Sequence, residues 1–149
     1  MINKVQAFSQ RTNCNPSFQA RERVLMIEKP DVFERKLENT LEGFLKDNGM
    51  EIVAEKQRPL NPDELRIHYA HVANKSFYPE IEDYMTSGKS KLMIVEGEDI
   101  ISKGTARKKT EAFRNIFAYN IMTQNLLHCS DSHESANEEI DRFFPELKA

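Results

Sequence analysis

Hydrophobic residues along the chain form short continuous runs that alternate with segments of helical spacing. Three apolar runs, at residues 24–27, 52–54 and 92–95, predict strands, because each is too short for a buried helix and a proline or glycine follows it closely. A fourth short segment, residues 125–128, is predicted to be a strand as well. The chain therefore carries four candidate strands, spread over most of its length.

Apolar residues spaced three and four apart predict helices between these strands. One helix is expected from Phe33 to Leu45, with Gly49 as its stop. A second begins at residues 61–64, where the sequence Asn-Pro-Asp-Glu supplies an N-cap, a first-turn proline and a capping glutamate. A third helix is predicted over residues 77–87.

The last helix is expected directly after the fourth strand. Asp131 and Glu134 have the spacing of a capping box, and Ala136, Ile140 and Phe143 follow at helical spacing. With a further helix between the third and fourth strands, the order becomes β-α-β-αα-β-α-β-α. This order predicts an α+β fold, a ferredoxin-like split βαβ arrangement in which helices cover one face of a four-stranded antiparallel sheet.

Length and composition limit the class of protein. A chain of 149 residues with 39% hydrophobic and 30% charged residues is typical of one globular domain. Residues 1–22 are polar and without sustained periodicity, so we expect an N-terminal extension followed by a folded domain over residues 23–149. Apolar runs are too short to cross a bilayer and the first residues lack a signal-peptide core, which predicts a cytoplasmic protein without a membrane partner.

Charge is unevenly distributed along the chain. The net charge of −3 argues against a general nucleic-acid-binding surface. Residues 103–114, however, carry five cationic side chains and one carboxylate, a local charge of +4. If this segment bound nucleic acid, the binding would depend steeply on salt. The two cysteines, Cys14 and Cys129, lack the spacing of a zinc site and are expected to be reduced, incidental thiols.

Two chemically capable side chains follow predicted strands. His128 ends the fourth strand and Lys29 follows the first. If these strands are neighbours, both side chains lie at one edge of the sheet, where a nucleophile beside a cation suits phosphoryl transfer. The plain alternative for each is a structural or solvated side chain.

Several stretches around these residues resemble the nucleoside diphosphate kinase family, in the order of that family. The matching stretches are ERVLMIEKPD (22–31), HY (68–69), FYPE (77–80), MTSG (85–88), VEG (95–97) and NLLHCSDSHESA (125–136). The last stretch is specific, whereas each of the others alone is weak. The resemblance implies that the γ-phosphate of a nucleoside triphosphate passes to His128 and then to a nucleoside diphosphate.

The resemblance also implies roles around this histidine. Lys29 would contact the phosphates and offset the charge that builds up during transfer. Glu139 would orient the imidazole, Ser130 would belong to the same hydrogen-bonded surround, and Tyr69 would lie near the histidine. Mg²⁺ would assist as the cofactor, held mainly by the nucleotide phosphates rather than by protein ligands.

The resemblance also implies nucleotide-binding residues, some by a direct match in sequence and some only by approximate position. Phe77 is expected to stack on the base beside Ile81, which would allow any base, and Asn125 to contact the sugar and phosphate end of the nucleotide. The phosphate-binding loop of the family is several residues shorter here. Arg107, Arg114 and Thr110 are the candidates for its two arginines and its threonine; the plain alternative is an exposed charged loop.

Two departures from the family pattern leave the function open. The shortened loop and Glu28, at a position that is apolar in the family, favour the alternative of a catalytically weak or inactive nucleotide-binding or scaffold protein. The leading hypothesis remains an active kinase. Since the family uses the loop region between subunits, we also expect a homo-oligomer, either a dimer or a hexamer.

Overall fold

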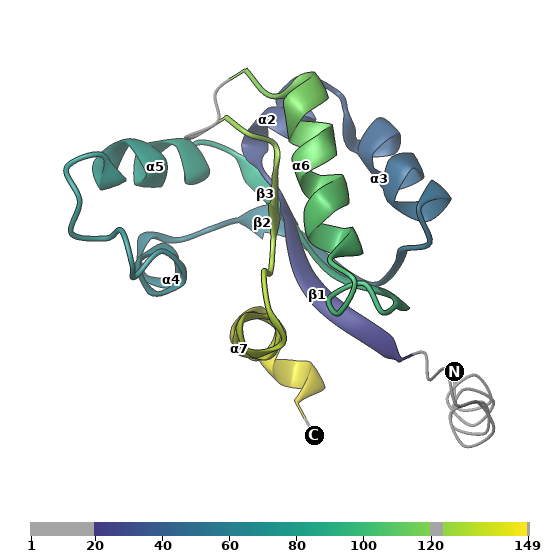
Figure 1. Ribbon diagram of the computed structural model, residues 1–149. Coiled ribbons are helices and arrows are strands. Elements are labelled where there is room, and N and C mark those ends of the chain that lie inside the picture. The colour runs from purple at the N-terminus through teal and green to yellow at the C-terminus, as the bar shows by residue number, and fades with distance from the viewer. Residues whose placement is uncertain (1–19, 120–123, 149) are drawn as a thin grey trace, which may run out of the picture.

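The structure, a computed structural model, describes residues 20–119 and 124–148. These residues contain a four-stranded sheet in the order β2-β3-β1-β4, with every neighbouring pair antiparallel (Figure 1). The strands are β1 (Arg21–Glu28), β2 (Glu51–Pro59), β3 (Lys89–Glu98) and β4 (Leu127–Cys129). The predicted α+β fold is therefore confirmed, and the first and fourth strands, whose pairing the sequence left as a condition, are neighbours.

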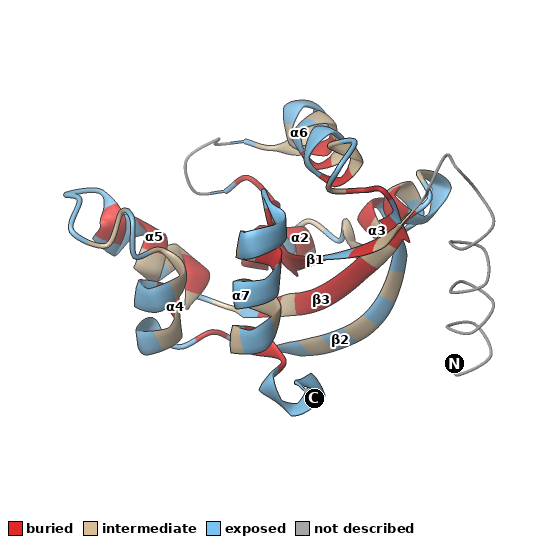
Figure 2. Ribbon diagram, turned by 60° about the horizontal axis from the view of Figure 1, so that its bottom comes forward, coloured by how far each residue is buried: buried red, intermediate tan, exposed pale blue. Residues whose placement is uncertain are grey.

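Helices cover both faces of this sheet, so the prediction of helices on one face was wrong (Figure 2). On one side, Val24 and Met26 of β1 pack with α2 (Pro30–Glu34), α3 (Glu38–Asp47) and α6 (Thr105–Phe117). On the other, Leu25 and Ile27 pack with α4 (Pro62–His68), α5 (Tyr78–Met85) and α7 (His133–Phe143). The unbroken apolar run in β1 is the sequence signal of a strand that is buried on both faces.

The helix boundaries differ from the prediction at two places. The helix expected from Phe33 to Leu45 is divided into α2 and α3, because Lys36 between them has a positive φ of 55° that a helix does not allow. The cap of α7 is Ser132, whose hydroxyl accepts from the Ser135 amide, rather than the expected Asp131. The capping box at the start of α4 is present as predicted.

The cationic segment lies mostly in helix α6. Gly104, with φ of 71°, precedes the helix, and Ala106, Thr110 and Phe113 form its buried side. Most of the cationic segment is therefore a helix packed on the sheet, rather than the loop suggested by the family pattern. Its basic residues lie on the faces of the helix that do not pack on the sheet.

The described part of the chain begins just before β1 and ends just after a short 3-10 helix. Residues 1–19 of the expected extension lie outside the described residues, and the last part of that extension, Arg21 and Glu22, belongs to β1. A short 3-10 helix, η1 (Pro145–Leu147), follows α7. None of the helices in the described ranges is long and apolar enough to cross a bilayer.

Candidate active site

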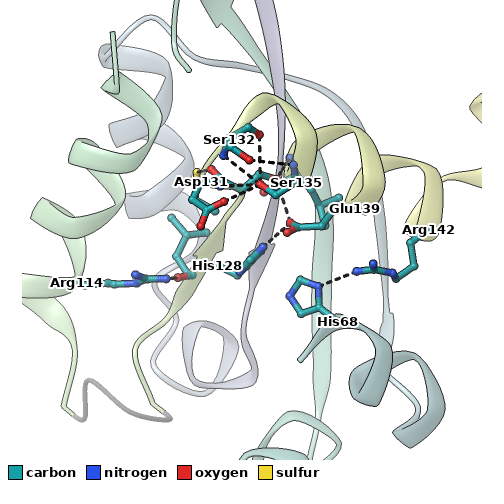
Figure 3. Close-up of polar contacts among 12 residues, drawn as sticks. His68, Arg114, His128, Asp131, Ser132, Ser135, Glu139 and Arg142 are labelled. Atoms are coloured by element: carbon teal, nitrogen blue, oxygen red, sulfur yellow. Dashed lines mark hydrogen bonds and ion pairs between the residues drawn. The ribbon is translucent and has the colours of Figure 1, made fainter. Parts of the chain in front are cut away.

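His128 lies on β4 and is held from one side by α7. Its Nε2 lies 2.6 Å from Glu139 Oε1, and the same oxygen accepts a 3.0 Å hydrogen bond from Ser130 Oγ (Figure 3). Ser130 Oγ in turn accepts a 3.0 Å hydrogen bond from the Leu25 amide of β1. Three elements thus fix one imidazole, and the structure brings the side chains of His128, Glu139 and Ser130 together.

The contact with Glu139 determines which ring nitrogen of His128 can react. An ionised carboxylate only accepts hydrogen bonds, so the neutral imidazole carries its proton on Nε2 and keeps a lone pair on Nδ1. Within the described residues, Nδ1 has no hydrogen-bond partner, and the side chain retains 19% of its exposure. Nδ1 is therefore the ring nitrogen of His128 whose lone pair is available.

Lys29 and Asn125 form a buried pair next to this histidine in the sheet. Lys29 Nζ donates a 2.6 Å hydrogen bond to Asn125 Oδ1, and the Lys29 amide donates to the Leu126 carbonyl at 2.9 Å. Burial, followed by the positive charge of Arg114, lowers the pKa of Lys29 to about 7. Lys29 therefore changes between its neutral and its charged form near neutral pH, and a nearby anion would favour the charged form.

A pocket of about 430 Å³ opens beside His128. It brings together six of the predicted site residues: Tyr69, Arg107, Thr110, Arg114, His128 and Glu139. Six further residues complete the lining: His68, His71, Glu111, Cys129, Asp131 and Ser135. Its size and its mixture of cations and hydroxyl groups suit the phosphate end of a nucleotide.

Five predicted site residues do not line this pocket. Lys29, Asn125 and Ser130 are buried in the sheet region described above. Phe77 is 37% exposed at the start of α5, and Ile81 is packed in the core beneath that helix. The contacts of Phe77 and Ile81 with a base therefore stay predictions, and Ile81 offers little surface for one.

The cations of α6 are engaged in different ways. Arg114 donates through Nε to the Leu127 carbonyl at 2.8 Å, and its Nη2 donates to the same oxygen. Arg107 forms an exposed pair with Glu111 at 3.2 Å. The Thr110 hydroxyl is buried without a geometrically sound hydrogen bond in the part of the chain described. Arg114 thus supports the residue before His128, Thr110 lies against the Cys129 thiol, and the exposed Arg107 keeps donors for a ligand.

Two other reactive groups of the pocket are inactive as nucleophiles. Burial raises the pKa of the Cys129 thiol to about 12 and that of the Tyr69 phenol to about 12 as well. Both groups therefore keep their protons at neutral pH.

His68 is the site residue that sequence reasoning missed. Its ring meets the His128 ring edge-on, with centroids 4.4 Å apart, and Arg142 Nη1 lies 3.3 Å from its Nδ1. The HY pair was the available signal, but only its tyrosine was assigned a role. The ligand atoms of His68, His128 and Glu139 lie within 4.8 Å of one another, as in a metal site, although the adjacent Arg142 opposes a cation there.

Carboxylates for a magnesium ion occur elsewhere in the pocket. Asp131 and Glu111 belong to its lining, and Asp131 Oδ1 accepts a 2.8 Å hydrogen bond from Ser135 Oγ. Magnesium prefers oxygen ligands and is commonly bound by one or two carboxylates together with substrate phosphates. The pocket therefore fits a nucleotide that carries Mg²⁺ on its phosphates.

Comparisons with known proteins give matches that cover most of the chain. A family model described as nucleoside diphosphate kinase matches residues 22–149. The nucleoside diphosphate kinases of Parafrankia sp. (strain EAN1pec) and Methanocaldococcus jannaschii are each 35% identical over 134 residues, covering 85% of this chain and 97% and 95% of theirs. A crystal structure of the Aquifex aeolicus nucleoside diphosphate kinase matches with a TM-score of 0.70 and 31% identity, over 84% of this chain and 96% of that one.

Proposed function

The chain belongs to the nucleoside diphosphate kinase family, and from this we propose that it moves the γ-phosphate between nucleotides through a phosphohistidine on His128. The observation that carries the proposal is the 2.6 Å contact between Glu139 and His128 Nε2, beside a pocket lined by cations. This contact leaves the Nδ1 lone pair for attack.

In the first half-reaction, His128 Nδ1 attacks the γ-phosphorus of the triphosphate. The new N–P bond forms as the bond to the β-phosphate oxygen breaks, so the nucleoside diphosphate leaves with that electron pair. The imidazole becomes positively charged, and Glu139 stabilises this charge through the Nε2 proton, which it accepts in a hydrogen bond without removing it.

The negative charge that moves onto the leaving diphosphate needs compensation from the protein. Arg107, which lines the pocket, and Lys29, which is buried outside its lining, would supply positive charge, and the Thr110 hydroxyl would donate a hydrogen bond. Mg²⁺, held by the nucleotide phosphates with Asp131 and Glu111 as the adjacent carboxylates, would neutralise part of the phosphate charge. The second half-reaction is the reverse, with a diphosphate oxygen attacking the phosphohistidine.

Labelling with a γ-³²P nucleoside triphosphate tests this mechanism. The folded protein should acquire an acid-labile label that an unlabelled nucleoside diphosphate removes, and His128→Ala should acquire none. The control is His133→Ala, since His133 is exposed and lies outside the pocket lining. A folded wild-type protein that stays unlabelled would overturn the proposal.

One observation favours the alternative of a nucleotide-binding protein with little turnover. Arg114 donates two hydrogen bonds to the Leu127 carbonyl, so it has fewer free donors for a phosphate than an arginine without such contacts. Nucleotide binding by calorimetry, without exchange of phosphate between a triphosphate and a different diphosphate, would decide for this alternative.

The cellular setting of the protein also belongs to this proposal. We expect a cytoplasmic homo-oligomer, either a dimer or a hexamer. In the described part of the chain, β2 pairs with β3 on one side only, which leaves backbone donors and acceptors of an edge strand for a second copy. Light scattering that finds a monomer at micromolar concentration would refute the oligomer.

A further inference from the structure

Arg142 of α7 contacts the nucleophile indirectly, through His68 at the end of α4. Its Nη1 lies 3.3 Å from His68 Nδ1, although the two residues are 74 positions apart in sequence. His68 meets the His128 ring edge-on, at a centroid distance of 4.4 Å and an interplanar angle of 78° (Figure 3). A continuous line of contacts therefore runs from Arg142 through His68 to His128.

The chemistry of the guanidinium group determines the state of His68. Arginine has only donors and stays charged, so the nitrogen facing it must be an unprotonated acceptor. His68 is then a neutral imidazole with its proton on Nε2. The contact thus selects one of the three states that a histidine side chain can adopt.

The surroundings of His68 favour the same neutral state. Its charged and titratable neighbours are Arg142 and Glu139 on α7, His128 on β4, Lys29 just after β1, and Tyr69 and His71 beyond α4. Burial is the main cause of a His68 pKa that lies well below its ordinary value, and the cationic or titratable groups His128, Arg142, Lys29 and His71 are the next. Phe143 packs edge-on against the ring at 5.5 Å and adds an apolar wall.

We propose that Arg142 is a positioning residue for phosphoryl transfer, which keeps His68 as a neutral ring of fixed tautomer so that His68 holds the imidazole plane of His128. This inference rests on the proposed function, because His128 is taken as the nucleophile. The physical reason is that His128 becomes positively charged on phosphorylation. A protonated His68 at this distance would oppose that charge, and a ring free to change tautomer would no longer fix the His128 plane.

Kinetics of phosphohistidine formation provide the first test. Arg142→Leu removes donor and charge together and should slow labelling about tenfold at neutral pH, with the acidic limb of the pH–rate profile moved to higher pH. Arg142→Lys, which keeps a charged donor, should recover most of the rate. Arg66→Leu, the same substitution at an exposed arginine of α4, is the control and should leave the profile unchanged.

A second variant shows whether Arg142 acts through His68. His68→Phe keeps an aromatic edge against His128 but has no nitrogen to titrate. In the His68→Phe background, Arg142→Leu should produce no further loss and no shift of the acidic limb. An equal loss in both backgrounds would mean that Arg142 acts by another route, and would overturn the proposal.

Nitrogen NMR of ¹⁵N-histidine-labelled protein gives a readout that needs no turnover. The wild-type spectrum should show His68 with a protonated Nε2 and an unprotonated Nδ1 well below pH 6.5, whereas in Arg142→Leu the ring should titrate closer to its ordinary pKa. An unchanged His68 titration in a folded Arg142→Leu protein would refute the proposal. Failure of wild-type labelling would instead refute the proposed function, since the spectra still decide the state of His68.

Discussion

Asn125 Oδ1 accepts a 2.6 Å hydrogen bond from Lys29 Nζ, although 96 residues separate the two in sequence. The pairing of β1 with β4 brings them together, because Lys29 follows β1 directly and Asn125 lies just before β4. A neutral amide oxygen satisfies the ammonium group without neutralising it. The side chain of Lys29 is therefore held in place before any ligand binds, and its charge depends on pH.

The first prediction is that nucleotide binding takes up a proton at Lys29. With a pKa of about 7 in the free protein, Lys29 is mostly neutral at pH 8, and a bound phosphate raises that pKa. Affinity for a nucleoside diphosphate should therefore fall as pH rises above 7, by up to about tenfold per unit. Calorimetry in buffers of different ionisation enthalpy measures the uptake. Lys29→Arg should show no such proton uptake, because arginine is always charged. Equal proton uptake in both proteins would contradict Lys29 as the group that takes up the proton.

The second prediction concerns Glu139. Glu139→Gln keeps the shape and an oxygen for His128 Nε2 but removes the negative charge, so phosphohistidine formation should slow by about 10- to 100-fold while nucleotide affinity stays nearly unchanged. Rapid-quench labelling separates the two quantities. Glu138→Gln, one residue earlier and exposed on α7, is the matched control. A loss confined to affinity would argue that Glu139 contacts the nucleotide instead.

The third prediction separates the two arginines of α6. Arg114→Met should lower the free energy of unfolding by about 1–3 kcal/mol, because the Leu127 carbonyl loses both donors, and should also weaken nucleotide binding. Arg107→Met removes only an exposed pair with Glu111, so stability should change by less than about 0.5 kcal/mol while binding still weakens. Urea unfolding and calorimetry check each pair of values. Equal stability losses would show that Arg114 is not a support of β4.

The fourth prediction concerns Glu28, the unusual carboxyl group of β1. Neither of its oxygens has a sound hydrogen bond in the described structure, and burial, then the neighbouring Glu42 carboxylate, raises its pKa to about 8. The folded protein thus holds a proton that the unfolded chain has lost above about pH 4.5. The ionisation of Glu28 therefore costs the folded protein nothing below about pH 4.5, and it lowers the free energy of unfolding progressively as pH rises towards 8.

Glu28→Gln should remove this dependence, because an amide cannot ionise. The variant and the wild type should unfold with similar free energies at pH 5, and the variant should be more stable by about 1–3 kcal/mol at pH 8.5. Glu80→Gln, at an exposed position of α5, controls for the loss of a carboxylate. Parallel curves for Glu28→Gln and wild type from pH 5 to 8.5 would mean that Glu28 is already ionised when folded.

Local features of the fold were predictable from sequence, and features that depend on packing were not. The apolar runs identified the strands, and the capping box at Asn61 fixed the start of α4, because both patterns act over a few residues. The break between α2 and α3 at Lys36 could not be predicted, because no glycine, proline or asparagine stands at that position. The covering of both sheet faces follows from how the helices pack, which the order of elements alone does not state.

The same distinction holds for the site. The sequence placed Lys29 directly after one short strand and His128 at the end of another. The structure pairs these two strands, with His128 as the middle residue of β4. Arg142 and His68 were missed, since their contact requires α4 and α7 to meet on one face of the sheet. Arg114 was expected at the phosphates, yet it also supports Leu127, a contact set by the helical path of residues 105–117 that the family pattern did not suggest.

The double link between Ser130 and Leu25 has a consequence for how the site moves. Ser130 donates its amide to the Leu25 carbonyl at 3.0 Å and accepts from the Leu25 amide, while its hydroxyl also reaches Glu139. Leu25 lies in the middle of β1 and is fully buried. The support of His128 is therefore anchored in the buried core of the sheet, so the geometry around His128 should persist through local fraying and disappear only when the domain unfolds.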